Sequence, residues 1–239
     1  MSLIFQELDN QKTSLGEISL RRRRLPAMGD RDIYEVKLGD EFLMSSLFVE
    51  GELALARLGL EALSGKNLSV IVGGLGLGYT AAAVLESERV ASLGVVEFLQ
   101  PVINWHKSGL VPVGEKLCAD ARCRFLQGDF FALAMRDDCD FDGGQSLVEH
   151  DAILLDIDHA PDNYLDDQNS SFYTEQGFQR LRAHLRDEGV FAIWSNDRRD
   201  ERFLELLGRV FRDPVAHEVE FANPLQNSTA INTVYVGRR

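Results

Sequence analysis

The fold is decided by Leu68-Ser-Val-Ile-Val-Gly-Gly-Leu-Gly-Leu-Gly-Tyr-Thr80, an apolar and β-rich segment that runs into a series of glycines. The helix-prone residues 80–86 follow at once, so the order predicts a strand, a tight turn and a helix. Glycine suits such a turn because it has no Cβ, which lets the backbone reverse direction and approach a ligand closely. Gly74, Gly76 and Gly78 are therefore predicted to bind a ligand.

The predicted ligand is a nucleoside. Glu97 ends a second apolar segment, Leu93-Gly-Val-Val-Glu97, about 20 residues beyond the glycines, where a carboxylate can accept hydrogen bonds from both hydroxyls of a ribose. The glycines alone would equally fit a turn that only packs a helix against a strand. The position of Glu97 at the end of the next strand favours nucleoside binding. The dinucleotide fingerprint Gly-x-Gly-x-x-Gly fits less well, because Leu77 and Tyr79 occupy positions where it needs glycine.

Composition restricts the partners of this chain. Its 239 residues are enough for one well-buried α/β domain with a small appendage. The formal net charge is -13, so a phosphate backbone is repelled over most of the surface and nucleic acid is not an expected partner. The run Arg21-Arg-Arg-Arg24 is a local exception, which we interpret as a solvated strand edge rather than a binding site.

Cysteine usage and hydropathy indicate a cytoplasmic protein. Cys118, Cys123 and Cys139 are odd in number and lack CxxC spacing, which disfavours a disulfide framework and a zinc site, and no metal is expected. No charged segment followed by an apolar one opens the chain, and the longest apolar stretch, around 68–85, is interrupted by glycines and too short to span a bilayer. No membrane association is expected.

Alternating elements predict an α/β fold with two parts. Residues 33–38 and 41–45 flank Gly39-Asp40, so residues 1–46 are predicted to form a small β-hairpin appendage. Residues 47–239 are predicted to form the main domain, beginning with a helix between Phe48 and Leu63. Strands are expected near 68–72, 93–97, 122–127, 151–157 and 189–195, and helices near 79–87, 100–108, 173–186 and 198–211.

That alternation is typical of a Rossmann-like, doubly wound sheet that is mostly parallel. Residues 214–221 and 230–236 have strand patterns with no helix between them. An antiparallel C-terminal hairpin should therefore complete a seven-stranded sheet.

Ligands of open α/β sheets bind outside the carboxyl ends of the strands, so the acids there are the candidate site residues. Several expected strands are followed by polar side chains at this end: Glu97, Asp129, Asp156, Asp158, Asn196 and Asp197.

The chain resembles the spermidine synthase family, within the class I fold of S-adenosylmethionine-dependent transferases. The resemblance extends over roughly residues 33–197 and is carried by Val-Gly-Gly-Leu-Gly-Leu-Gly78, Val-Val-Glu97, Gly128-Asp129, Asp151-Ala-Ile-Leu-Leu-Asp156 and the segment 171–181. It implies that the glycine loop, Glu97 and Asp129 bind S-adenosylmethionine or its decarboxylated form, with Asp129 at the adenine. It also implies that Asp156 is catalytic and that the protein is a homodimer.

The amine site departs from the family pattern. The family has Asp-Ser-Ser/Thr-Asp-Pro after the catalytic strand, whereas this chain has Asp156-Ile-Asp-His-Ala-Pro161, with Asp158 at a different spacing and His159 in place of the second acid. Glu52 matches the glutamate of the family's Tyr-His-Glu segment, without its Tyr and His. Asp158 is a candidate for catalysis, and Glu52, Asp158 and His159 are candidates for binding a small-molecule amine or polyamine.

Aminopropyl transfer needs a carboxylate that orients an amine and accepts its proton, because the sulfonium is already a good leaving group. Asp156 is the candidate, although a strand-end aspartate can also cap a helix. Asp156, Asp158, Asp162, Asp166 and Asp167 form an acidic segment that would attract a polycation, or that merely reflects an acidic protein.

The leading interpretation is an aminopropyltransferase that uses decarboxylated S-adenosylmethionine. The alternatives are a methyltransferase that uses intact S-adenosylmethionine and a nucleoside-binding homologue without activity. Val72 counts against the methyltransferase, since many of those enzymes carry an acid two residues before the first glycine of the loop.

Overall fold

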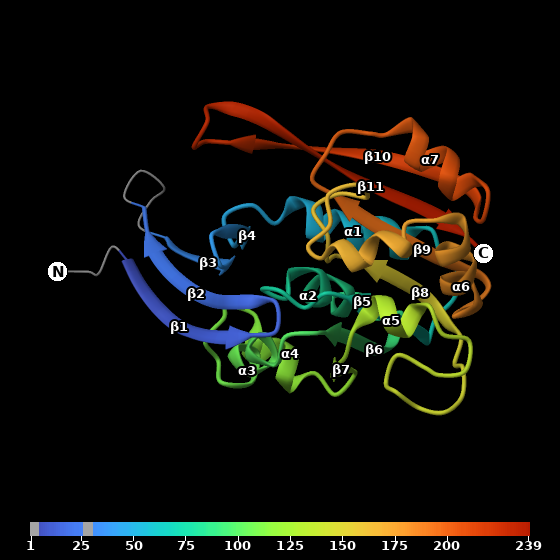
Figure 1. Cartoon of the computed structure of the whole chain (residues 1–239), viewed down its shortest axis with the longest axis horizontal. Coiled ribbons are helices and arrows are strands. Elements are labelled where there is room, and N and C mark those ends of the chain that lie inside the picture. The colour runs from blue at the N-terminus through green and yellow to red at the C-terminus, as the bar shows by residue number, and fades with distance from the viewer. Residues whose placement is uncertain (1–4, 26–30) are drawn as a thin grey trace.

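The protein, described by a computed structural model at residues 5–25 and 31–239, contains two β-sheets (Figure 1). Parts of the appendage expected over 1–46, namely residues 1–4 and 26–30, lie outside the described residues. A four-stranded antiparallel sheet has the order β1-β2-β3-β4, and a seven-stranded sheet has the order β10-β11-β9-β8-β5-β6-β7. The α/β fold class and the seven-stranded sheet are confirmed.

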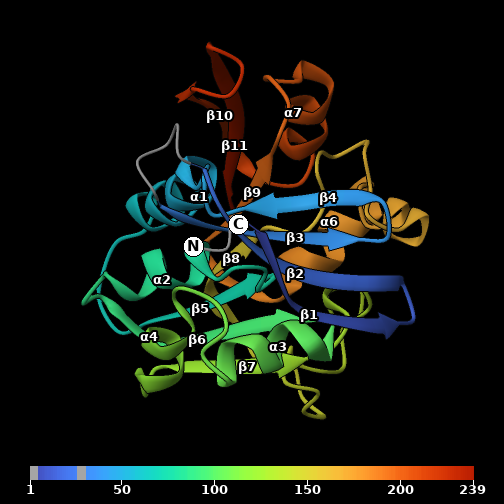
Figure 2. The ribbon, with the colours of Figure 1, turned by 90° about the vertical axis from the view of Figure 1, so that its left-hand side faces the viewer.

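The small sheet comprises β1 (Phe5–Thr13), β2 (Gly16–Arg24), β3 (Asp32–Leu38) and β4 (Glu41–Ser45). The expected hairpin is β3 and β4, and the two strands before it are additional. Figure 2 looks onto this sheet and shows its strands lying across the end of the larger one.

The arginine run lies in β2, between β1 and β3, so its prediction as a sheet edge is wrong. Its side chains pair with acids on the neighbouring strands: Arg21 with Glu7, Arg22 and Arg24 with Asp32, and Arg23 with Glu35. Apart from Glu35, which is buried, these side chains are partly exposed, and such pairs contribute little each to stability, but they neutralise the arginines within the sheet.

The large sheet is built as expected, with β5 (Leu68–Gly73), β6 (Val90–Glu97), β7 (Cys123–Gln127), β8 (His150–Leu155) and β9 (Leu185–Ser195) parallel to one another. β10 (Arg212–Asn223) and β11 (Ser228–Arg238) form the antiparallel hairpin, which pairs through β11 with β9.

Helices cover both faces of this sheet. α1 (Glu50–Glu61), α2 (Tyr79–Leu85), α3 (Gln100–Lys107) and α4 (Gly114–Ala119) pack on one face, and α5 (Phe130–Ala134), α6 (Glu175–Ala183) and α7 (Glu201–Gly208) pack on the other. A short 3-10 helix, η2 (Asp167–Ser171), precedes α6. α6 ends three residues before the expected 186, because β9 already begins at Leu185, which pairs with His150.

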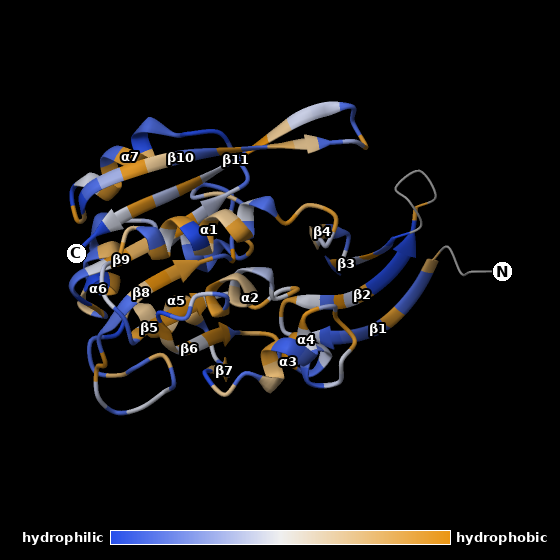
Figure 3. Ribbon diagram, turned by 180° about the vertical axis from the view of Figure 1, so that it is seen from behind, coloured by the Kyte–Doolittle hydropathy of each residue, from blue (hydrophilic) through white to orange (hydrophobic). Residues whose placement is uncertain are grey.

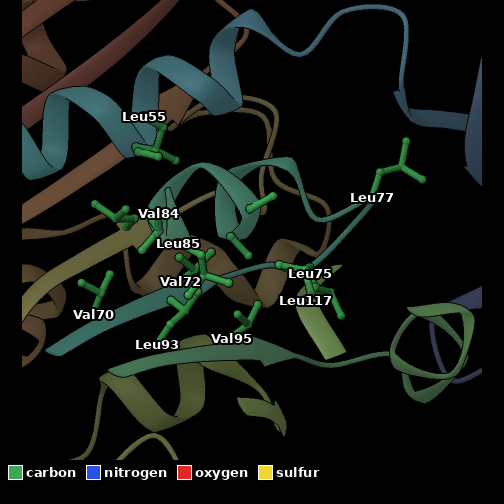
Figure 4. Close-up of a cluster of buried hydrophobic side chains, with 14 of the residues drawn as sticks. Leu55, Val70, Val72, Leu75, Leu77, Val84, Leu85, Leu93, Val95 and Leu117 are labelled. Carbon is green, nitrogen blue, oxygen red and sulfur yellow. The ribbon is translucent and has the colours of Figure 1, made fainter. Parts of the chain in front are cut away.

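Alternate residues of each parallel strand enter two hydrophobic clusters, one on each side of the sheet. On the α1 side, Val70 and Val72 of β5 pack against Leu55 and Val84 (Figure 4). The hydropathy of the ribbon follows this arrangement, since β5 and β8 are strongly hydrophobic while β1 and β2 are largely hydrophilic (Figure 3). Burial on both faces accounts for the continuous apolar runs in the sequence.

Within the described residues, no helix combines the length and the apolar character that crossing a bilayer would require.

Candidate active site

A cavity of about 410 Å³ lies between the two sheets, at the carboxyl ends of β5, β6, β8 and β9. The glycine loop and the strand-end acids Glu97, Asp129 and Asp156 line it, together with Glu52 and His159. The small sheet supplies the opposite wall through Ser14, Leu15, Ile18, Val36, Leu43 and Met44. Most of the predicted site residues are thus brought to one cavity, as expected for an open parallel sheet.

The glycine loop follows β5 in a conformation that requires glycine. Gly74, Gly76 and Gly78 have φ angles of +95°, +48° and +88°. A Cβ at Gly74 would collide with the backbone carbonyl of Asp156, and one at Gly76 would lie 2.6 Å from the sulfur of Met44. The loop is thereby pressed against both β8 and the small sheet, and its backbone faces the cavity.

His106 supports the loop from α3. Its Nε2 lies 2.9 Å from the carbonyl oxygen of Gly76, so this ring nitrogen donates to the loop. Burial lowers the pKa of His106, which favours the neutral ring. His106 thus has a structural role, which is to hold the glycine loop.

Glu97 lines the cavity from the end of β6. Its Oε1 accepts a hydrogen bond from the backbone N–H of Leu99 at 2.8 Å, and its Oε2 accepts one from Leu75 in the glycine loop at 3.1 Å. Burial raises the pKa of Glu97, while these backbone donors oppose the shift. Each carboxylate oxygen retains acceptor capacity for a ligand hydroxyl.

Asp129, which is exposed, lines the same cavity after β7. Its Oδ1 caps α5 by accepting from the N–H groups of Phe131 at 2.9 Å and Ala132 at 3.1 Å. Because both bonds use the same oxygen, Oδ2 is left for a donor such as an exocyclic amino group.

Asp156 follows β8 and contacts the residues of the glycine turn. Its N–H donates to the carbonyl of Gly73 at 2.8 Å, and its Oδ2 accepts from the hydroxyl of Thr80 at 2.5 Å. No side chain caps α2, so Asp156 does not act as a helix cap there. Burial raises the pKa of Asp156 to about 6.

Glu52 reaches the cavity from the first turn of α1. Burial, and then the nearby negative charge of Asp156, raise its pKa to about 8. The negative charge of one carboxylate therefore disfavours ionisation of the other. Such a pair is stabilised when it binds a proton or a cationic ligand.

Asp158 does not line the cavity. It is 3% exposed, and its carboxylate accepts from the N–H of Leu165 at 2.7 Å, from Asn169 at 2.9 Å and from the hydroxyl of Tyr173 at 2.8 Å. Burial raises the pKa of Asp158, with the three donors opposing. This acid shapes the loop after β8 and does not reach the cavity, where both catalysis and amine binding were expected of it.

The loop that Asp158 holds forms part of the cavity wall through Leu165, Asp166, Gln168 and Asn169. His159 also lines the cavity, with its Nε2 4.0 Å from the carboxylate of Glu41. Of the five aspartates in the acidic segment, only Asp156 and Asp166 line the cavity.

Sequence reasoning missed Trp194, which lines the cavity from the end of β9. It also missed the apolar wall contributed by the small sheet. An aromatic residue at a strand end was the available signal for Trp194, whereas the wall depends on how the two sheets pack.

No protein-family model matches the sequence, and no curated protein resembles it significantly in sequence. Solved structures do resemble it. The crystal structure of spermidine synthase from Thermotoga maritima superposes with a TM-score of 0.70, at 15% identity, over 98% of this chain and 72% of that one. The chain has a spermidine synthase-like fold. A spermidine synthase in complex with the transition-state analogue AdoDATO superposes with a TM-score of 0.73, at 15% identity, over 98% of this chain and 73% of that one.

The spermidine synthase-like fold includes the small sheet, since the superposition covers nearly the whole chain. At this identity the likeness concerns the fold, and the roles of individual residues rest on the geometry of the cavity.

Proposed function

We propose that this protein transfers an aminopropyl group from decarboxylated S-adenosylmethionine to a small-molecule amine. The observation that carries the proposal is the buried carboxyl pair Glu52 and Asp156, beside a glycine loop and Glu97 in one cavity. The solved spermidine synthase with a bound transition-state analogue supports the choice of donor by analogy of fold.

Different residues of the cavity bind the nucleoside and the amine. The glycine loop approaches the nucleoside, Glu97 accepts from the ribose hydroxyls, and Asp129 accepts from the adenine amino group. The neutral amine attacks the carbon attached to sulfur, the new C–N bond forms, and the C–S bond breaks to release methylthioadenosine. Asp156 takes the proton that the nitrogen loses, as its position at the charged end of the cavity favours.

Charge distinguishes the decarboxylated donor from the intact one. No lysine or arginine of the described residues lines the cavity, whereas Glu52 and Asp156 do. The carboxylate of intact S-adenosylmethionine would therefore lie near negative charge without a cationic partner. The decarboxylated donor carries no carboxylate, so this repulsion does not arise.

Titration calorimetry with the two donors in one buffer tests the proposal. We expect the decarboxylated donor to bind at least tenfold more tightly, which is about 1.4 kcal/mol. Mass spectrometry should detect methylthioadenosine and an aminopropylated amine. Equal or stronger binding of intact S-adenosylmethionine with methyl transfer would establish a methyltransferase instead, and tight binding without turnover of any amine would indicate a homologue without activity.

Replacement of the ribose-binding acid provides the matched variant. Glu97→Ala should weaken methylthioadenosine binding by about 3 kcal/mol or more, because two charge-assisted hydrogen bonds are lost. Unchanged affinity in this variant would exclude Glu97 from the nucleoside site.

A further inference from the structure

The end of the cavity near Glu52 and Asp156 has one charged wall and one apolar wall. The charged wall consists of these two carboxyl groups, from α1 and β8. The facing wall belongs to the small sheet, and it is apolar except for one hydroxyl: Ser14, Leu15, Ile18, Val36, Leu43 and Met44. An acceptor bound between them meets negative charge at one end only.

Trp194 adds an aromatic surface beside the carboxyl pair. β8 and β9 are paired in parallel, with Leu154 opposite Ala192 and Leu155 opposite Ile193, so Asp156 and Trp194 occupy the next position on each strand. Paired residues of adjacent strands lie about 5 Å apart and point to the same face of the sheet. Asp156 and Trp194 therefore project together toward α1.

The indole nitrogen of Trp194 is not exposed to the cavity. This nitrogen, Nε1, is buried without a hydrogen-bond partner among the described residues. A Cβ on Gly51 would collide with this nitrogen, so the N–H edge is turned toward the first turn of α1. An aromatic ring beside two carboxyl groups suits an ammonium that carries an alkyl or aryl substituent.

The other acids around the cavity are committed elsewhere. Glu97 and Asp129 accept from backbone N–H groups at the predicted nucleoside end. Asp158 is directed into its own loop, and Asp166 caps η2 by accepting from Gln168 at 2.9 Å. A second ammonium placed against the small sheet would be desolvated among apolar side chains, since none of the described residues of that wall carries a carboxylate.

We propose that the preferred acceptor is a monoamine with an apolar body, bound with its nitrogen between the Glu52–Asp156 pair and Trp194 and its body on the small sheet. This inference rests on the proposed function and narrows its substrate class. Trp194 and Leu43 are the residues that determine the choice between a monoamine and a diamine.

n-Hexylamine and 1,6-diaminohexane test the inference, because they differ only by the distal amino group. Calorimetry with the full-length protein, in the presence and absence of saturating methylthioadenosine, should show at least tenfold tighter binding of n-hexylamine. Equal or tighter binding of 1,6-diaminohexane would overturn the inference. Loss of methylthioadenosine binding would contradict the proposed function instead, while the amine ranking without nucleoside would still decide the acceptor class.

Variants of the two determinants sharpen the test. Trp194→Ala should weaken n-hexylamine binding about tenfold, and Trp194→Phe should retain most of it, since both rings offer an aromatic face. Leu43→Glu should shift the preference toward 1,6-diaminohexane by supplying the missing counter-charge. Leu225→Ala, at the exposed tip of the β10–β11 hairpin, is the control and should leave the ranking unchanged. An unchanged ranking in Leu43→Glu would count against the apolar wall as the determinant.

Discussion

Asp156 and Asp158 lie two residues apart in sequence, yet their carboxylates have different surroundings. Asp156 lines the cavity and bonds to Thr80, whereas Asp158 bonds to three donors of the following loop. A chemical role requires access to the substrate, so only Asp156 is placed to take a proton from an amine.

Replacement of Asp156 should therefore affect turnover more than nucleoside binding. Asp156→Asn keeps the shape of the side chain but cannot take up a proton, so kcat should fall about 100-fold or more. The affinity for methylthioadenosine, measured by calorimetry, should change by less than about threefold. A fully active Asp156→Asn enzyme would remove Asp156 from the mechanism.

Asp158→Asn is the matched comparison and should act on stability. An amide cannot accept from all three donors of the loop, and a buried unsatisfied group costs about 1–3 kcal/mol. Urea unfolding should show a loss in this range, larger than that of Asp156→Asn. Unchanged stability of Asp158→Asn would show that the three hydrogen bonds do not hold the loop.

The pKa of Glu52 leads to a prediction on stability and pH. The folded state raises this pKa from 4.5 to about 8, so the folded protein binds the proton more tightly than the unfolded chain does. The resulting stabilisation is complete below about pH 4.5 and is lost as the pH rises toward 8. Asp156, with its pKa raised to about 6, acts in the same direction.

Glu52→Gln should flatten this dependence between pH 5 and 8 in urea unfolding. Since one pKa unit corresponds to about 1.4 kcal/mol, the difference between the two proteins should reach a few kcal/mol at pH 8. Glu61→Gln, a change at an exposed glutamate at the other end of the same helix, should follow the wild type. Parallel profiles for wild type and Glu52→Gln would contradict the buried carboxyl pair.

Residue positions were predictable where a general rule of the fold applied. Strand-end acids of a parallel sheet meet at one edge, and Glu97, Asp129 and Asp156 do line the same cavity. The burial of Asp158 and its hydrogen bonds were not predictable, because they depend on the path of the loop up to Tyr173. Trp194 was missed because an aromatic residue in an apolar strand is usually a core residue.

At the scale of elements, buried strands were predictable and polar strands were not. β5 and β6 are mostly apolar and end in Gly73 and Glu97, β8 is apolar from Ala152 and is followed by Asp156, and β9 is apolar from Val190 to Trp194, as expected for a sheet covered on both faces. β1 reads Phe-Gln-Glu-Leu-Asp-Asn-Gln-Lys-Thr, which lacks a clear alternation, and it forms a strand by pairing with β2. α4 and α5 are too short to show helical periodicity.

The turn between β5 and α2 is the element on which the proposed nucleoside binding depends. Gly74→Ala would suffer both the strain of a positive φ and a collision with the carbonyl of Asp156. Gly65→Ala has a similar φ of +88°, but nothing lies within 4 Å of its new Cβ. The pair therefore separates backbone strain from close approach.

We expect Gly65→Ala to cost about 1–2 kcal/mol of stability and to leave methylthioadenosine binding unchanged. Gly74→Ala should cost more and should weaken nucleoside binding at least tenfold, because the loop must move away from β8. Calorimetry and urea unfolding measure both quantities. Wild-type binding by Gly74→Ala would show that the turn need not approach the ligand closely.

At the scale of the whole molecule, two sheets share one core and one cavity. Ile18, Leu20 and Val36 of the small sheet belong to the same hydrophobic cluster as α1 and β5. A hydrogen bond of 2.6 Å from the buried indole of Trp105 on α3 to Asp9 on β1 adds a polar contact between the two parts. A ligand in the cavity should therefore strengthen the association of the sheets.

Hydrogen exchange measures this coupling, because ligand bound only by the folded arrangement stabilises every contact that the arrangement requires. Methylthioadenosine together with n-hexylamine at 100 times their dissociation constants should slow exchange in β1, β2 and the turn at Ser14 and Leu15, which line the cavity. The stabilisation available from each ligand is about 2.7 kcal/mol.

Asp9→Ala should speed exchange in β1 without ligand, since the indole of Trp105 loses its acceptor, and ligand should restore part of the protection. Glu220→Ala, on the exposed side of β10, should behave as the wild type. Protection confined to the glycine loop, with β1 and β2 unchanged, would show that the small sheet does not close on the ligand.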